Sequence, residues 1–285
     1  MHNTIGGDKM DNAKEGLHSL QEQAQRILIR LLKEHFGKEI EQLSDYLPDL
    51  FEQLWKVRLV EDKELRKLGL NFLCEAKRDL KTCNVLYSKK FYPHATYHFQ
   101  QAVEKASKGY MLGFGLLTKE ELFTHDTPEL FLKALLEKTG VESWANRLAD
   151  ENLKELIDKA KLVIGKSEKR QEVAQASYEE INKHICSIDV YKDTAKRMCQ
   201  SVISEISRII EAMPPPPPIF QALSALAVLF ILAAISFPHE AYTRYPDKEI
   251  TPSNYTATLG VVRAIPKMMK YLQPEINNLK TVISG

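Results

Sequence analysis

The sequence predicts an all-α protein, an up-and-down bundle of helices with an inserted helical subdomain. Apolar residues recur at three- and four-residue steps over most of the chain, which places them on one face of a helix. The composition, 44% hydrophobic and 27% charged, is globular, so collagen-like, low-complexity and wholly disordered classes are excluded. The net charge of +1 predicts no general attraction for nucleic acid or membrane, although a local basic patch remains compatible with it.

Residues 1–62 are expected to form an N-terminal helical extension that packs on the main core. One helix is predicted between Leu17 and Phe36, where apolar residues share one face and Gly37 ends the pattern. A second, short helix follows Pro48. The domain proper is then expected over residues 63–285.

Three helices open this domain. The apolar spacing from Leu68 to Tyr87 predicts a long helix, and a turn at residues 91–93 follows it. The stretch from His94 to Phe114 contains good helix formers and no internal proline. A cap followed by proline at residues 124–128 then predicts a shorter helix, which ends near residue 136.

Residues 141–213 are rich in lysine and glutamate, and we expect them to form a helical insertion. Their isoleucines and leucines predict three amphipathic helices, with breaks near Gly165 and Asp189. Five prolines at residues 214–218 end the segment, and such a run favours an extended, stiff spacer.

Residues 219–237 are almost wholly apolar, and two interpretations fit them. Their length and hydropathy suit a membrane span, which would make the chain a membrane-anchored helical protein. Their alanine content equally suits a helix that is buried on all sides within a bundle. The last helix is predicted over residues 254–283, with a kink at Pro266.

Three motifs together resemble the HEPN family of small helical domains. They are AKRDL at residues 76–80 leading into YHFQQAVEKASKGY at 97–110, THD at 124–126, and TRYPD at 243–247. The resemblance covers about residues 68–138 and 219–283. It implies one closed bundle, in which the 219–237 helix must pack beside its neighbours, and this favours the core interpretation over the membrane span.

The resemblance also implies a function and partners. It implies a nucleotide- or RNA-binding interaction module of a toxin–antitoxin or defence system, able to form a homodimer and paired with a nucleotidyltransferase-type antitoxin. Many members of the family are metal-independent ribonucleases that carry an Arg and a His four to six residues later on one helix. Imidazole there moves the proton of the 2′-hydroxyl, and guanidinium steadies the phosphate charge.

This chain departs from that ribonuclease pattern, because no histidine follows Arg244. His239 precedes Arg244 by five residues, in the reverse order. The Arg30–His35 pair has the right spacing but lies outside the matching segments. We therefore expect no ribonuclease activity, and the alternative is an RNA endonuclease that uses Arg244 and His239.

A nucleotide or RNA ligand would be bound by Arg244 and Lys105, with Tyr245 as a stacking surface. Each residue also has a structural interpretation, which the sequence favours. Tyr245 can shape a turn, Asp247 can cap it or pair with Arg244, and Lys105 can lie on a solvated face.

No metal or cofactor site is expected. His94 and His98 have the spacing of metal ligands on one helix face, but no third ligand lies at a recognisable distance. The four cysteines form no CxxC pair, and residues 1–10 carry no apolar signal core. Reduced cysteines and a cytoplasmic location are therefore expected.

Overall fold

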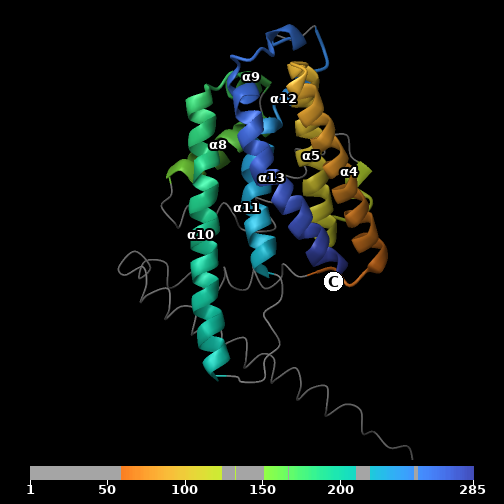
Figure 1. The fold of residues 1–285 in the computed structure, drawn as a ribbon, viewed down its shortest axis with the longest axis vertical. Coiled ribbons are helices and arrows are strands. Elements are labelled where there is room, and N and C mark those ends of the chain that lie inside the picture. Colours follow the sequence, from red (N-terminus) through yellow and green to blue (C-terminus); the bar gives the residue numbers. More distant parts are fainter. Residues whose placement is uncertain (1–58, 124–131, 133–150, 166, 210–218, 247–249) are drawn as a thin grey trace, which may run out of the picture. The chain divides into compact units, whose positions relative to one another are not determined.

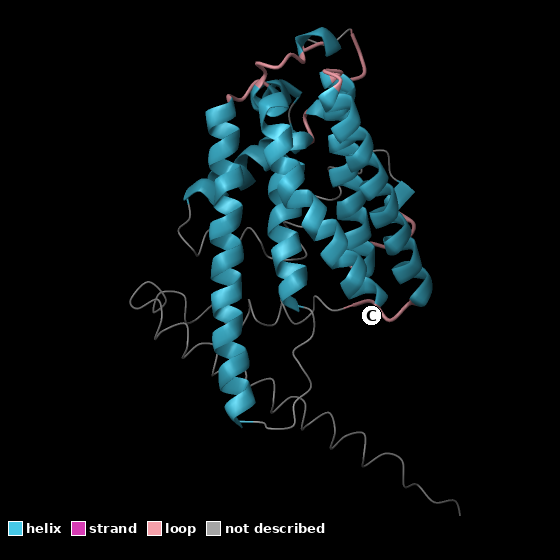
Figure 2. Cartoon of the chain, in the orientation of Figure 1, coloured by secondary structure: helices cyan, strands magenta, loops and turns pink. Residues whose placement is uncertain are grey.

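A computed structural model of the protein describes residues 59–123, 132, 151–165, 167–209, 219–246 and 250–285. Within these ranges the secondary structure is helical and contains no strand (Figure 2). The predicted all-α fold class is thus confirmed. The chain divides into two compact units, and every contact below lies in the larger one, Gln53–Ala195 with Pro217–Gly285.

Helices α4 (Lys63–Ser88) and α5 (Tyr92–Gly113) form an antiparallel hairpin. Helix α4 begins five residues earlier than the apolar pattern predicts, because the Asp62 carboxylate accepts hydrogen bonds from two amides of the first turn. The hairpin is tightly packed. A Cβ atom on Gly109 would lie 2.9 Å from the carbonyl oxygen of Gly69, so the two helix backbones are in contact.

Helices α11 (Ile219–Ser236) and α13 (Gly260–Ser284) pack against this hairpin and complete the bundle (Figure 1). Residues 228–232 of α11 are at most 1% exposed. The core-helix interpretation is therefore confirmed. In the described part of the chain, no helix has the length and apolar character that crossing a membrane requires. Helix α13 contains two prolines, Pro266 and Pro274.

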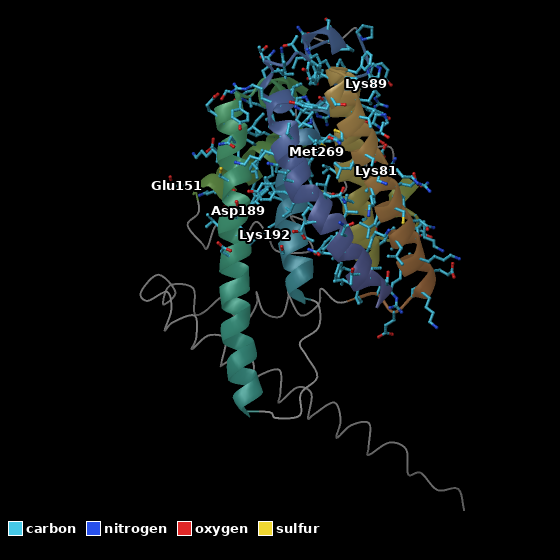
Figure 3. The ribbon with its side chains drawn as sticks, in the orientation of Figure 1. Lys81, Lys89, Glu151, Asp189, Lys192 and Met269 are labelled. Atoms are coloured by element: carbon cyan, nitrogen blue, oxygen red, sulfur yellow. The ribbon has the colours of Figure 1, made fainter. Side chains whose placement is uncertain are left out.

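The segment between the two pairs contains α8 (Glu151–Gly165), α9 (Ser167–Ala174) and α10 (Tyr178–Ile209). The predicted break at Gly165 is confirmed, but the break at Asp189 is wrong. Helix α10 runs straight through Asp189, labelled in Figure 3, whose carboxylate accepts a 2.5 Å hydrogen bond from the hydroxyl of Tyr271 on α13. Its apolar face continues across this residue, and Ile185, Ile188 and Tyr191 are buried.

Short elements connect these helices: η1 (Glu121–Phe123), α12 (His239–Tyr242) and η2 (Pro252–Asn254). The helix predicted at residues 124–136 lies outside the described residues except for Leu132, which is buried. The predicted N-terminal extension also lies outside them up to residue 58. The boundaries of the extension and of the 141–213 insertion stay predictions.

Candidate functional site

Polar side chains gather along one face of α5, between α4 and α12. The sequence places a polar residue on this face at each turn, because residues three, four and seven apart in a helix share a side. All of these side chains are half-buried. We call this set the α5 polar face; its members are Tyr97, His98, Gln101, Glu104, Lys105 and Lys108.

A carboxylate from α4 holds two members of the face. One oxygen of Asp79 lies 2.9 Å from Nδ1 of His98, and the other accepts a 2.5 Å hydrogen bond from the Lys105 ammonium. The Asp79 side chain is 13% exposed, so this arrangement is shielded from bulk water. Asp79 therefore fixes the orientation of an imidazole and a cation whose own side chains are still more than a quarter exposed.

Glu104 organises the next turn of the same face. Its carboxylate accepts hydrogen bonds from the amides of Gln100 and Gln101, and it pairs with the Lys108 ammonium at 2.9 Å. The Lys108 ammonium also lies 5.7 Å from the ring centroid of Phe72, within cation–π range.

Arg244, just after α12, is fixed by Glu240 from the preceding turn. Its Nε donates to the Glu240 carbonyl at 3.0 Å, and its Nη2 donates to the Glu240 carboxylate at 2.7 Å. The guanidinium carbon also lies 5.7 Å from the ring centroid of Tyr97 and 5.3 Å from that of Tyr245. The result is a preoriented guanidinium, 38% exposed, beside two aromatic rings.

Several charges act on Glu240. Burial raises the pKa of its carboxyl group, Arg244 opposes this rise, and the neighbouring carboxylate of Glu104 adds to it. Arg170 of α9 also lowers this pKa from a distance. The charges of the α5 polar face therefore act electrostatically on the Glu240–Arg244 pair.

His239 lies away from solvent on α12. Its side chain is 1% exposed, and its Nδ1 shares a 2.7 Å hydrogen bond with the hydroxyl of Tyr255. Burial lowers the pKa of the imidazole to about 3. An enclosed, neutral histidine of this kind has no access to an RNA 2′-hydroxyl.

The structure thus places the sequence-predicted residues in different settings. Arg244 and Tyr245 lie together, and Lys105 lies on the α5 polar face with a partner, Asp79, that its position beside Glu104 did not indicate. His239 is in the core. Asp247, the expected partner of Arg244, lies outside the described residues, and Glu240 pairs with Arg244 instead.

Sequence reasoning missed most residues of the site. The i,i+4 spacing of Glu240 and Arg244 on a helix could have indicated their ion pair. The i,i+7 spacing of His98 and Lys105 places them on one face, but no sequence signal joins them to a carboxylate of another helix. The missed residues are Asp79, Tyr97, His98, Gln101, Glu104, Lys108 and Glu240.

In the ranges that the structure describes, no group of three His, Cys, Asp or Glu side chains could hold a metal ion. His94 is exposed, while His98 is paired with Asp79. Cys74, Cys83 and Cys186 are free thiols, and burial raises the pKa of Cys83 to about 12.

Comparison with known proteins identifies similar sequences. The family model of the HEPN domain matches residues 71–214, about half of the chain. The matched range includes the 141–213 segment. A protein of Methanocaldococcus jannaschii named "Putative toxin MJ1304" is 31% identical over 77 residues, which are 27% of this chain and 48% of that protein. The chain therefore spans about half the length of this relative, and no solved structure matches significantly.

Proposed function

Because this chain belongs to the HEPN domain family, we propose that it is a nucleotide- or RNA-binding interaction module of a toxin–antitoxin or defence system. The ligand is bound where α12 meets the α5 polar face. The similarity to a protein named as a toxin supports the biological setting.

One observation carries the binding proposal: the Arg244 guanidinium is held in place beside two tyrosine rings. A planar guanidinium is suited to phosphate, and aromatic rings accept stacked bases. The Glu240 contacts already restrict the side chain, so less conformational entropy is lost when a phosphate binds. Lys105, whose ammonium already pairs with Asp79, is the second cation proposed to face the ligand, and the exposed ring of Tyr245 supplies a stacking surface.

The alternative function, an RNA endonuclease that uses Arg244 and His239, draws no support from the placement of His239. A general base has to reach the proton that it removes, and His239 is buried against Tyr255. We therefore propose binding without ribonuclease chemistry at this pair. A homodimer and a nucleotidyltransferase-type antitoxin remain the proposed partners, and both rest on the family resemblance.

The test compares Arg244→Ala with Arg263→Ala. Arg263, in the first turn of α13, is a matched control. It too pairs with a glutamate, Glu179, and lies over a tyrosine ring, that of Tyr178. Fluorescence anisotropy with a labelled single-stranded RNA and with ATP measures affinity. Loss of one charge-assisted phosphate contact is expected to weaken binding by about tenfold or more in Arg244→Ala, and by less than about twofold in the control.

Two outcomes contradict the proposal. The first is that the wild-type protein binds neither probe. The second is that both variants lose affinity equally. Incubating the same RNA with wild-type protein and resolving it on a denaturing gel tests the endonuclease alternative, which requires cleavage that disappears in His239→Asn and Arg244→Ala.

A further inference from the structure

A pocket of about 80 Å³ lies among α8, α9, α10 and α11. Its wall is mostly aliphatic and comes from four helices that follow one another in the sequence. The apolar wall includes Leu156, Ala160, Val163, Ile181, Ala234 and Ile235.

One polar group of the wall lacks a partner. The imidazole of His184, on α10, lines the pocket and is 5% exposed. Among the described residues, its Nδ1 has no hydrogen-bond partner, although it is fully buried. Buried nitrogens nearly always find a partner, because an unsatisfied one costs the protein its hydration free energy. In the structure this nitrogen is closed off from the pocket, so a ligand would reach it only after the ring turns about its Cβ–Cγ bond. A hydrogen bond to such a ligand would then recover that cost.

The imidazole is uncharged at neutral pH. Burial lowers the pKa of His184, and the nearby ammonium of Lys159 lowers it further. The ring can therefore donate or accept one neutral hydrogen bond, according to its tautomer.

Each charged group of the lining already has a partner of opposite charge. The Lys159 ammonium contacts the carboxylates of Glu155 and Glu180, and Glu172 pairs with Lys169 at 2.6 Å. A charged ligand would lose its hydration without gaining a free counter-charge in the pocket. The pocket therefore favours an uncharged guest.

From these observations we propose that the pocket binds a compact, uncharged molecule with a branched aliphatic body and one hydroxyl or amide group directed to His184. The volume is about half of the ~150 Å³ of an engineered apolar cavity that accepts the six carbons of benzene, so the enclosed body has roughly three to four non-hydrogen atoms. This site is separate from the α5 polar face and does not depend on the proposed nucleic-acid function.

Four probes with one body and different heads test the proposal: isobutanol, isobutyramide, isobutyrate and isobutylamine. Methyl-resolved NMR of the full chain follows Ala160, Ile181 and Ala234 during each titration. Isobutanol and isobutyramide are expected to give saturable shifts, with dissociation constants on the order of 1 mM as suits so small a ligand. The carboxylate and the amine are expected to bind at least about tenfold more weakly.

Two kinds of variant locate the binding. Ala160→Leu adds three carbons to the wall and is expected to abolish saturable shifts for every probe. If thermal unfolding shows that this variant does not fold, Ala234→Leu makes the same test from α11. His184→Leu keeps the wall apolar and is expected to weaken isobutanol binding about fivefold or more, whereas His94→Leu, at an exposed histidine on α5, leaves it unchanged.

Three results would overturn the proposal. One is that no uncharged probe gives saturable shifts in the wild-type protein. Another is that a folded wall-filling variant binds as well as the wild type. A third is that the amine or the carboxylate binds more tightly than the alcohol.

Discussion

Lowering the pH from 7 to 5 is expected to destabilise the fold by about 2 kcal/mol through His239 alone. The imidazole is enclosed in the folded state, where its pKa is about 3, whereas an unfolded chain protonates histidine near pH 6.5. A depressed folded-state pKa means that the unfolded state binds more protons below pH 6.5. The stability that His239 contributes is therefore fully present above pH 6.5 and is lost as the pH falls toward 3.

The magnitude follows from the two pKa values. Each pH unit between them costs about 1.4 kcal/mol, so the whole interval is worth roughly 5 kcal/mol. At pH 7 almost none of this cost is present. At pH 5 the unfolded histidine is nearly all protonated while the folded one is not, and the difference between the two conditions is about 2 kcal/mol.

Urea unfolding at pH 7 and pH 5 measures this difference, with His239→Asn as the reference. Asparagine does not titrate and can still hydrogen-bond to Tyr255, while other histidines with lowered pKa values, such as His184, remain in both proteins. The wild type should lose about 2 kcal/mol more than the variant between the two conditions. Equal losses, within about 0.5 kcal/mol, would refute both the buried neutral state of His239 and the case against its acting as a general base.

Two further predictions concern packing and charge in the bundle. Lys192→Met should lower the unfolding free energy by about 3 kcal/mol, because it leaves the fully buried carboxylate of Glu275 without its ammonium partner at 2.5 Å. The double variant Lys192→Met with Glu275→Leu should recover most of this loss. A loss below about 0.5 kcal/mol in the single variant would contradict the reasoning. Gly260→Ala should lower the unfolding free energy by about 2–3 kcal/mol, because the new Cβ meets backbone atoms of Ser177 and Tyr178. Gly113→Ala should lower it by only about 1 kcal/mol, because the new Cβ meets the side chain of Ile283, which can move. Chemical denaturation measures both losses. Equal losses in the two variants would show that the backbone at Ser177 and Tyr178 moves aside as easily as a side chain does.

Sequence reasoning succeeded where a local pattern decides the structure. The 3.6-residue apolar period predicts α4, a stretch of good helix formers without proline predicts α5, and a continuous apolar run predicts the helix α11. It missed the first turn of α4, which has no apolar pattern. There the carboxylate of Asp62 caps the helix and so starts it earlier.

The errors and omissions have a common physical source, which is contact between distant segments. A break was expected near Asp189, yet α10 continues through this residue, and the hydroxyl of Tyr271 satisfies its carboxylate from another helix. Lys105 was expected on a solvated face, and its actual partner, Asp79, is on a different helix. The partner of Arg244 is the exception, because Glu240 is only four residues away, and the spacing permits this ion pair without requiring it.

The backbone contact between Gly69 and Gly109 bears on how the site can respond to a ligand. At this crossing the two backbones are in contact and the Leu73 side chain lies beside Gly109, so α4 and α5 have little freedom to slide. The hairpin therefore holds Asp79, His98 and Lys105 at fixed spacings. Arg244 is held from the other side of the site, by Glu240 of α12 and by the ring of Tyr97 on α5. The site is thus formed before a ligand arrives, and a ligand has to match the spacing between the lysine and the arginine.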